Sequence, residues 1–389
     1  MIRVAFTLIG GKNWTGGQNY LHNLLEVVAQ YQAAALTPVL FVGEDNAEAA
    51  TTFHAIPGVQ VVYTPCLNFS RRKFALLQSL TWGKDRCMAS AFKQHQIDLV
   101  FESAQFFGWR LGVPAIAWIP DFQHRGLPHL FSRAAWWKRE IGFRAQVIGG
   151  RTIMLSSDDA RRACEHYYPA TQGATCTVHF AIPPREQINY VKARAVADTY
   201  HLPEQFLFMP NQFWRHKNHE LVLEALTILK QRGKHIVIAA SGKQSDPRDP
   251  DYFPRFLAAL KKSGMEQSFR LLGLIPYSHL MSLMRCCTAL LNPSLFEGWS
   301  TTVEEARAMG TPMILSDLEV HREQMGDQAT YFDRHSAQSL ANALACVQVV
   351  RSPQRETHAE NARVAALQRV EQFSRDFVDL AKQCVSQKQ

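Results

Sequence analysis

The stretch from Ala289 to Ser316, ALLNPSLFEGWSTTVEEARAMGTPMILS, constrains the fold more than any other part of the chain. Its pattern predicts a buried strand at 289–291, a loop, a helix from about Thr301 to Gly310, and a second buried strand at 313–315. Gly310 and the proline two residues later are typical stop signals of a helix. Strand, helix and strand in this spacing are typical of a parallel sheet with helical crossovers.

The beginning of this helix gathers groups that suit a phosphorylated ligand. Thr301 and Glu304 fit a capping box, with Thr as the cap and Glu three residues later. Glu297 lies in the preceding loop, and Glu305 lies in the first turn. Unpaired N–H groups and the helix dipole attract phosphate, and a carboxylate accepts hydrogen bonds from sugar hydroxyls. The arrangement therefore predicts a nucleotide sugar as the ligand.

Glu297 and Glu305, with seven residues between them in PSLFEGWSTTVEEARAMGTP, resemble the E-x7-E signature of the GT4 family. These are retaining glycosyltransferases with the GT-B fold, and the Pro-Ser, Phe-Glu-Gly, Glu-Ala and Gly-Thr-Pro pairs and triplets around the two carboxylates make the resemblance specific. It implies an α/β architecture of two Rossmann-like domains with parallel sheets facing across a cleft. The expected domains are residues 1–185 for the acceptor, 186–370 for the nucleotide sugar, and 371–389 as a helix crossing back to the first domain.

Apolar stretches bounded by turn residues predict strands in both halves of the chain, alternating with helical patterns. The predicted strands of the first half are 2–9, 38–43, 59–63, 98–102, 114–119, 152–157 and 177–180. Those of the second half, outside the stretch described above, are 206–210, 235–241, 269–272 and 330–332. Residues 183–200 begin with two prolines and are expected to be the linker.

Two motifs of the first half follow predicted strands, where ligands of open α/β sheets bind. Gly16 and Gly17 close a loop before a helix predicted at 18–29. The resemblance implies that this loop lies near the donor diphosphate, although a tight turn explains each glycine as well. Asp121 and His124 lie in the segment IPDFQH, which resembles one branch of bacterial GT4 enzymes. Proline replaces the family's usual histidine before Asp121, so His124 is either its substitute or a loop histidine bonded to backbone.

A basic loop in the second half follows the strand predicted at 206–210 and contains Arg215 and Lys217. In the related enzymes this loop carries an Arg and a Lys that hold the donor diphosphate. Lys217 matches that Lys, whereas the usual Arg position falls on Asn211 or Gln212, so that contact is either missing or supplied by Arg215. These cations would balance a leaving nucleoside diphosphate, so neither a metal nor a cofactor is expected.

The resemblance also implies roles for the remaining candidates. Leu274 and Ile275 follow a strand at a position that contacts the nucleotide base, with core packing expected for one of them. Glu297 is expected to hold the donor sugar, and Glu305 the ribose. The complete set comprises catalytic Glu297, Asp121 and His124, and donor-binding Gly16, Gly17, Arg215, Lys217, Leu274, Ile275, Ser294, Gly298, Trp299, Ser300, Thr301 and Glu305.

Charge and aromatic residues narrow the classes of partner. The chain carries 42 Lys and Arg against 34 Asp and Glu, and residues 1–185 hold 18 and 12 of these, a net +6. A basic surface fits anionic lipid or nucleic acid, or is no more than a solvated face, and no nucleic-acid recognition motif is present. Trp136 and Trp137 on a basic predicted helix are either a membrane contact or one core and one partly exposed residue.

The compartment is inferred from what the sequence lacks. No run of about 18 apolar residues occurs, so no transmembrane helix is expected. The N-terminal MIRVAFTLIGGKNW fits a first strand better than a signal peptide. Eight scattered cysteines without a C-x-x-C spacing indicate reduced thiols and a cytoplasmic protein.

The sequence therefore predicts a retaining glycosyltransferase. We expect a sugar, with GDP-mannose favoured over UDP- or dTDP-sugars, to be moved to a glycan or lipid-linked acceptor in bacterial surface polysaccharide synthesis. Peripheral contact with the inner face of the cytoplasmic membrane is a further expectation. Two alternatives stay open: a nucleotide-sugar epimerase of GT-B fold, and a non-catalytic protein that binds a nucleotide sugar or glycan.

Overall fold

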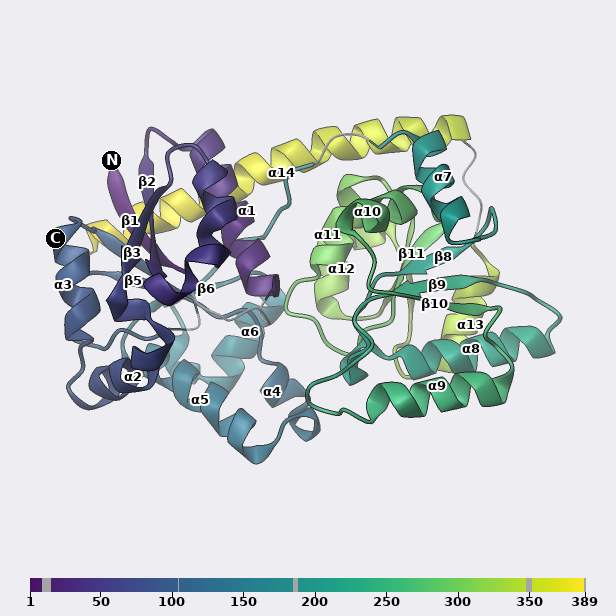
Figure 1. The fold of residues 1–389 in the computed structure, drawn as a ribbon, viewed down its shortest axis with the longest axis horizontal. Coiled ribbons are helices and arrows are strands. Elements are labelled where there is room, and N and C mark those ends of the chain that lie inside the picture. Colours follow the sequence, from purple (N-terminus) through teal and green to yellow (C-terminus); the bar gives the residue numbers. More distant parts are fainter. Residues whose placement is uncertain (9–14, 104, 185–187, 348–351, 388–389) are drawn as a thin grey trace. The chain divides into compact units, whose positions relative to one another are not determined.

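The computed structural model describes residues 1–389 apart from 9–14, 104, 185–187, 348–351 and 388–389, and it divides into two compact units (Figure 1). The first unit comprises Met1–Phe122, Arg133–Pro183 and Gln368–Gln389, and the second comprises Gln123–Ser132 and Pro184–Leu367. The chain thus divides after Pro183, beside the expected boundary at 185. Residues 123–132, which the sequence assigned to the first domain, belong to the second unit.

The first unit is built on a seven-stranded parallel sheet with the order β3-β2-β1-β4-β5-β6-β7. Its central strands β2, β4 and β5 are almost fully buried because helices lie over the sheet, as is usual for parallel sheets (Figure 1). The strands are β1 Ile2–Thr7, β2 Leu36–Gly43, β3 Gln60–Thr64, β4 Leu99–Ser103, β5 Ala115–Trp118, β6 Thr152–Leu155 and β7 Thr175–Thr177. The helices named below are α1 Thr15–Tyr31, α2 Arg72–Thr81, α3 Arg86–Gln94, α5 Arg133–Ile148 and α6 Asp158–Tyr167.

The loop predicted around the paired glycines is wrong in its extent. Helix α1 begins at Thr15, so Gly16 and Gly17 form its first turn instead of preceding it. A Cβ built on Gly16 would have no atom of the described residues within 4 Å. Gly10 and Gly11, the other expected edge of the loop, lie outside the described residues.

The second unit repeats the architecture with a six-stranded parallel sheet, β10-β9-β8-β11-β12-β13. Its strands are β8 Leu207–Met209, β9 Ile238–Ser241, β10 Phe269–Gly273, β11 Ala289–Asn292, β12 Met313–Ser316 and β13 Thr330–Phe332. Its helices include α4 Gln123–Gly126, α7 Tyr190–Thr199, α8 His219–Gln231, α9 Tyr252–Ser263, α10 Tyr277–Cys286, α11 Thr301–Ala308, α12 Glu319–Met325 and α13 Ala337–Ala345. Two apolar clusters of buried side chains make up its core.

The expected linker contains a helix. Asn189 caps α7 by accepting a hydrogen bond from the N–H of Val191 at 2.8 Å. Ala193 and Ala197 of α7 are fully buried in the same cluster as Leu283 of α10, so this segment is part of the second unit's core. The terminal helix also begins before the expected segment 371–389, because α14 extends from Ser352 to Ser386.

The cysteines are not all reduced, contrary to the expectation from their spacing. Cys66 and Cys87 form a disulfide with a Cα–Cα distance of 5.6 Å, and they are 21 residues apart in the sequence. Cys66 lies in a short turn after β3 and Cys87 in the first turn of α3. The fold brings these Cα atoms to bonding distance, which sequence spacing alone does not reveal. No helix among the described residues is long and apolar enough to span a membrane.

Candidate functional site

The strand order of the second sheet reverses between β8 and β11. Ligands of doubly wound sheets bind beyond the carboxyl ends of the strands at this point. The loop after β8 carries Lys217, and the loop after β11 carries Glu297. The backbone N–H of Leu295 donates to the carbonyl of His216 at 2.8 Å, so the two loops are joined directly.

A buried ion pair connects the side chains of these loops. Lys217 Nζ lies 2.6 Å from Glu297 Oε1, and the two side chains are 17% and 11% exposed. Asn218 adopts a left-handed conformation with φ of 59°, which ends the turn at Arg215–Lys217 and begins α8. The sequence-predicted Lys217 and Glu297 are therefore brought together.

One oxygen of Glu297 is held by several donors. Ser294 Oγ lies 2.7 Å and Asn292 Nδ2 lies 3.5 Å from Oε1, which also pairs with Lys217. Asn292 Oδ1 accepts from the Ser294 backbone N–H at 3.3 Å, which fixes the turn between the two residues. Glu297 Oε2 accepts no hydrogen bond from the described residues. The carboxylate is thus anchored through one oxygen and keeps the other for a ligand.

The charge state of Glu297 follows from this environment. Burial alone would raise the pKa of the carboxyl, but the charge of Lys217 and the hydrogen bonds from Lys217 and Ser294 lower it below its usual value. Glu297 is therefore an anion at neutral pH, with acceptor capacity only. The Glu297 carboxylate, held as an anion in this way, is suited to accept hydrogen bonds from hydroxyls.

The helix after this loop is capped by a different residue from the one predicted. Ser300 is the N-cap of α11, and its Oγ accepts from the Val303 N–H at 3.4 Å. Thr301 is instead the first helical residue and is exposed. The predicted capping box is wrong because Ser300 Oγ also accepts from Asn292 Nδ2 at 3.1 Å, which fixes Ser300 at the helix start.

Gln324 of α12 holds the first turn of α11 in place. Its Nε2 donates to the Ser300 carbonyl at 3.0 Å and to Glu304 Oε1 at 3.2 Å, and its Oε1 accepts from the Ser300 N–H at 3.3 Å. Glu304 is buried and accepts this hydrogen bond inside the unit. The sequence did not single out Gln324, because its role depends on the packing of two helices.

His321 is a second buried group of this site that the sequence did not single out. Its Nδ1 lies 3.0 Å from the Ser316 carbonyl, which can only accept, so Nδ1 carries the proton. Its Nε2 is buried and has no hydrogen-bond partner among the described residues. Burial lowers the pKa of His321, with Lys217 and Arg334 adding to this effect and Glu297 opposing it. The imidazole is thus neutral and offers an acceptor at Nε2.

Two arginines lie in this region: the predicted Arg215 in the basic loop after β8, and Arg248 in the loop after β9. Arg215 has an exposed side chain, and its backbone N–H is held by Asp246 Oδ2 at 3.0 Å. Arg248, in the polar loop after β9, lies between the rings of Phe131 and Trp214 at 5.2 and 5.1 Å from their centroids. An arginine stacked between two aromatic rings is held by cation–π attraction. The sequence missed Arg248, because its loop has no periodic pattern.

Arg248 also binds the histidine next to Lys217. Its Nη2 lies 3.0 Å from His216 Nδ1, and its Nη1 donates to Gln123 Oε1 at 2.8 Å. Burial, followed by the charges of Lys217 and Arg248, lowers the pKa of His216 well below its usual value, so its ring is neutral and can accept from Arg248.

Residues 123–132 contribute to the same unit. His124 is fully buried in α4, and its ring centroid lies 6.4 Å from that of Phe131. A Cβ built on Gly126 would lie 3.0 Å from the ring of Phe296, the residue before Glu297. The predicted His124 is therefore carried by a segment that packs against the Glu297 loop.

Asp121 lies just outside this segment and belongs to the first unit. Its Oδ1 pairs with Arg139 Nη2 at 2.7 Å, and Arg139 also donates to the Asp121 carbonyl at 3.3 Å. Asp121 therefore makes a structural contact with α5, and its catalytic role stays a prediction.

The remaining predicted contacts lie around α11. Gly298 and Trp299 are half-buried in the loop after β11. Glu305 accepts from the Tyr277 hydroxyl at 2.9 Å. Leu274 is exposed, whereas Ile275 packs against the core, so these two neighbours face different surroundings, as the sequence suggested.

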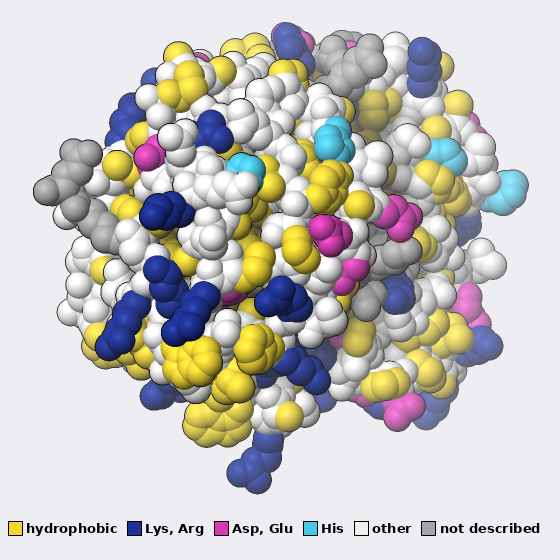
Figure 2. All heavy atoms as spheres, turned by 60° about the vertical axis from the view of Figure 1, so that its left-hand side comes forward, with side chains coloured by type: hydrophobic (Ala, Val, Ile, Leu, Met, Phe, Trp, Pro, Cys, Tyr) yellow, Lys and Arg dark blue, Asp and Glu magenta, His cyan; other side chains and the backbone are white. Residues whose placement is uncertain are grey.

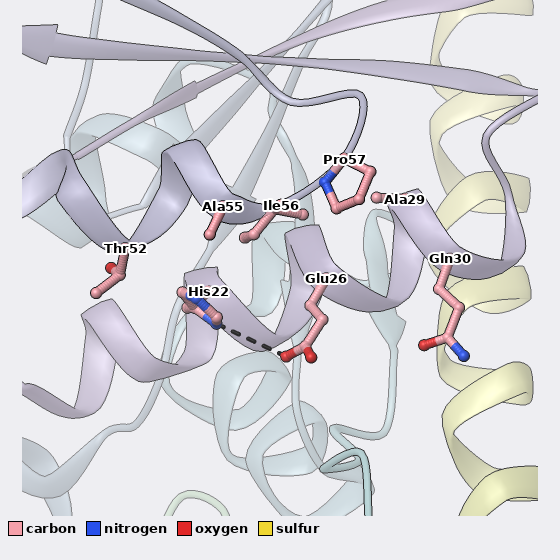
Figure 3. Close-up of a pocket in the computed structure, with 8 residues that line it drawn as sticks. All are labelled: His22, Glu26, Ala29, Gln30, Thr52, Ala55, Ile56 and Pro57. Atoms are coloured by element: carbon pink, nitrogen blue, oxygen red, sulfur yellow. Dashed lines mark ion pairs between the residues drawn. The ribbon is translucent and has the colours of Figure 1, made fainter.

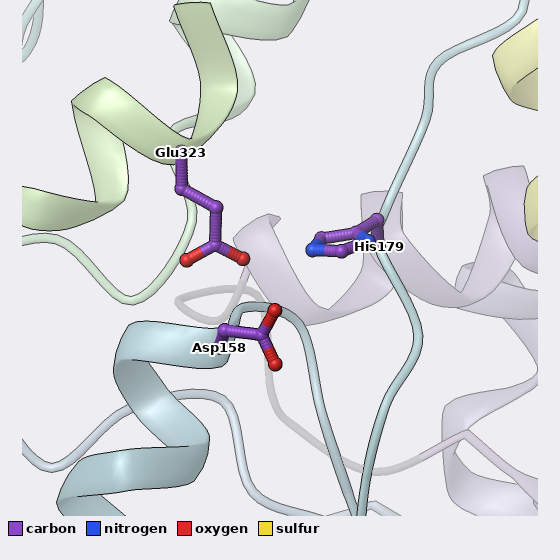
Figure 4. A group of neighbouring side chains, drawn as sticks. All are labelled: Asp158, His179 and Glu323. Atoms are coloured by element: carbon purple, nitrogen blue, oxygen red, sulfur yellow. The ribbon is translucent and has the colours of Figure 1, made fainter. Parts of the chain in front are cut away.

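The first unit offers two further groups, neither of which contains a sequence-predicted site residue. A cavity of about 400 Å³ lies between α1 and the segment after β2 (Figure 3). It is lined by the polar His22, Glu26, Gln30 and Thr52 and by four apolar residues, Ala29, Ala55, Ile56 and Pro57. Figure 4 draws Asp158, at the start of α6, and His179, which follows β7. Asp158 Oδ1 accepts from Thr177 Oγ1 at 2.8 Å and from Arg161 Nε at 3.0 Å.

Residues 194–364 match the family model described as glycosyl transferases group 1. This region contains the Lys217 loop, the Glu297 loop and α11. No curated protein sequence matches the chain.

Three solved structures resemble the chain over 98% of its length. A glycosyltransferase from Rickettsia africae ESF-5 has a TM-score of 0.71 with 13% identity and is covered over 98% of its own chain. Anabaena Alr3699/HepE, in complex with UDP and glucose, has a TM-score of 0.70 with 16% identity and 100% coverage. WaaG, a glycosyltransferase involved in lipopolysaccharide biosynthesis, has a TM-score of 0.61 with 15% identity and 99% coverage.

The fold is GT-B, with two Rossmann-like domains. The two doubly wound parallel sheets and the structural neighbours agree on this architecture. The match at 194–364 to glycosyl transferases group 1 agrees with this fold.

Proposed function

We propose that this protein is a retaining glycosyltransferase of the GT4 type that acts without a metal. One observation carries the proposal: Glu297 is ionised and anchored through Oε1 by Lys217 and Ser294, while Oε2 is left for a ligand. A carboxylate fixed in this way, at the switch point of a parallel sheet and beside a helix N-terminus, suits sugar hydroxyls.

Lys217 would bind the diphosphate while keeping its ion pair with Glu297. An ammonium group has three N–H donors, and the structure gives one hydrogen bond, to Glu297 Oε1. The other donors suit phosphate oxygens, and charge-assisted bonds of this kind stabilise the negative charge of a departing diphosphate. The N–H groups at the start of α11 add the favourable end of the helix dipole. Arg215, exposed in the same loop, is the second cation of the proposal.

The other predicted residues take supporting roles in this proposal. Glu305, held by Tyr277, would contact the ribose, and Ile275 would contact the base through its backbone. Asp121 and His124 would act on the sugar or the acceptor. In retaining GT-B enzymes the leaving phosphate is thought to take the proton of the incoming hydroxyl, which removes the need for a protein base.

We favour mannose from GDP-mannose as the donor sugar. The acceptor we favour is a glycan or lipid-linked oligosaccharide of a surface polysaccharide. UDP, one of the two other donor nucleotides left open, is bound in the Anabaena HepE structure. WaaG is involved in lipopolysaccharide biosynthesis. Both are properties of those proteins, and they suggest which donors and acceptors to test first.

The test combines binding with turnover. Thermal shifts against GDP, UDP and dTDP identify the nucleotide, because a ligand of the native state raises its stability. Transfer from the matching sugar nucleotide is then measured with and without EDTA. We expect Glu297→Gln to lower turnover by at least about 10²-fold, while Glu224→Gln, an exposed carboxylate change on α8, leaves it unchanged. Equal turnover in both variants contradicts the proposal, and a loss in EDTA contradicts its metal-independent part.

Product analysis separates the two alternatives. An epimerase converts the sugar nucleotide without an acceptor, and a binding protein shows a thermal shift with neither transfer nor hydrolysis. Inverted configuration at the anomeric carbon would contradict retention alone.

A further inference from the structure

Helix α2 in the first unit has its apolar face outside. Phe74 and Leu77, three residues apart and hence on one face, are 54% and 57% exposed, and Leu76 beside them is also exposed. The buried residue of this helix is Ser79, whose Oγ donates to the Ala75 carbonyl at 2.9 Å. An amphipathic helix normally turns its apolar stripe to the core, so the reversal leaves an apolar surface without a partner among the described residues.

The chain after α2 extends this surface. Trp82 is 56% exposed, and Phe69 before the helix and Trp109 from a neighbouring loop are exposed as well. Gly83 holds the two loops together, because its φ is +73° and a Cβ there would lie 2.4 Å from the Trp109 ring. Its carbonyl accepts from the Arg110 N–H at 2.7 Å. The exposed aromatic side chains are therefore presented by an ordered backbone.

The disulfide closes this segment at its base. Cys66 and Cys87 lie on either side of residues 67–86, which contain α2 and Trp82. We call Phe69, Phe74, Leu76, Leu77 and Trp82 the α2 surface. Cross-linking the ends of a segment restricts its conformations, so the α2 surface is held as one structural element.

Positive charge surrounds the α2 surface. Residues 67–86 contain five Lys and Arg and one Asp, a net +4, and the Asp, Asp85, is buried. The guanidinium of Arg72 lies 4.3 Å from the centroid of the Phe69 ring, and that of Arg86 lies 5.1 Å from the centroid of the Trp82 ring. Figure 2 shows one face of the molecule, and in its lower part hydrophobic side chains lie among those of Lys and Arg.

We propose that the α2 surface docks on an anionic phospholipid bilayer. Aromatic and aliphatic side chains on one face of a helix enter the interface between headgroups and acyl chains, and the flanking Lys and Arg meet the lipid phosphates. A second copy of the chain is the wrong partner, because each α2 surface brings a net +4 to the contact. The site differs from the expected Trp136–Trp137 contact on α5, where Trp137, Ile141 and Ile148 also lie exposed. The inference does not depend on the proposed enzymatic activity.

The test is flotation of the full chain with vesicles. Phosphatidylcholine vesicles are compared with vesicles of equal parts phosphatidylcholine and phosphatidylglycerol, at low and high salt. We expect binding to the anionic vesicles, weakened by salt because screening reduces the attraction. Phe74→Ser with Leu77→Ser lowers the partition coefficient at least roughly tenfold. Lys73→Ala with Arg86→Ala lowers it by a similar factor, at roughly fivefold per charge.

A matched pair of changes on α5 is the control. Trp137→Ser with Ile141→Ser removes two exposed apolar side chains from another helix of the same unit and is expected to leave vesicle binding unchanged. Loss of binding in the α5 variant but not in the α2 variant overturns the proposal. So does equal binding to neutral and anionic vesicles, or no binding at all. Concentration-dependent dimers that the α2 changes abolish would identify a second copy as the occupant instead. Unchanged thermal unfolding of the α2 variants shows that lost binding is not lost folding.

Discussion

The Glu297 loop of the second unit and the α2 surface of the first differ in which side chains they bury. Around Glu297, charged and polar groups are buried, and Lys217, Ser294 and Gln324 form specific hydrogen bonds there. Around α2, large apolar side chains are exposed while a serine is buried. Both arrangements cost free energy of folding, because buried charges lose hydration and exposed apolar groups forgo burial. Each is therefore a place where function, and not stability, is the better explanation.

The largest expected effect comes from breaking the buried pair. Lys217→Ala leaves Glu297 buried without its cation, and we expect the free energy of unfolding to fall by about 3 kcal/mol. Transfer is expected to fall by at least about 10²-fold. Urea unfolding and initial-rate kinetics measure the two effects. Lys230→Ala, on the exposed side of α8, is the control.

A double change separates the two effects. Lys217→Met with Glu297→Gln removes both charges, so most of the lost stability should return while transfer stays low. If the double variant is less stable than Lys217→Ala alone, the pair is not the buried element that we describe.

The next prediction concerns the pH dependence of the free energy of unfolding, which the buried His219 on α8 should affect. Burial lowers the pKa of His219 to about 3, from an ordinary value of 6.5. Because the folded-state pKa lies below the unfolded one, this group's stabilising contribution is complete above pH 6.5 and is lost as pH falls towards 3. His219→Leu should reduce the acid-induced loss in this window by up to about 1.4 kcal/mol per pH unit. Urea unfolding at a series of pH values measures the slope, and parallel curves for both proteins would contradict the assignment.

Arg248 gives a smaller effect. Arg248→Ala removes the hydrogen bonds to Gln123 and His216 and the stacking between Phe131 and Trp214. We expect a loss of about 2 kcal/mol in the free energy of unfolding. Arg248→Lys should recover only part of it, because a lysine cannot form the same planar contacts. Full recovery by Lys would show that charge alone matters.

The smallest effect is expected on the α2 surface. Phe74→Ser should change the free energy of unfolding by no more than about 0.5 kcal/mol, because the side chain is already largely in solvent. Phe92→Ala, at a fully buried position of the adjacent α3, should cost about 3–5 kcal/mol. Similar losses in the two variants would remove the contrast between exposed and buried aromatic residues.

The sheets were predictable because their strands are short, apolar and bounded by turn residues. The stretch from Ala289 to Ser316 was predicted as strand, loop, helix and strand, and the structure has β11, α11 and β12 there. Helix starts were less certain, since Ser300 and Thr301 are both good caps and only the contact with Asn292 decides between them. The start of α1 was missed because glycine is an unfavourable helix former.

The candidate site was only partly predictable. Lys217 and Glu297 lie in loops that the sequence marks, and the structure pairs them. His321, Gln324 and Arg248 act through contacts between separate elements, which no local pattern records. One signal was available: Asn292 and Ser316 are polar residues at the ends of apolar strands, where ligand-binding edges of parallel sheets begin.

The Cys66–Cys87 bond makes the behaviour of the α2 segment depend on the history of a sample. A thiol reagent opens the ring of chain between the two sulfurs and returns conformational freedom to it. Two preparations with the same sequence, one handled with reductant and one without, would then display α2 differently to the solvent. Mobility on a non-reducing gel distinguishes them, and it should be recorded before any vesicle measurement is compared between laboratories.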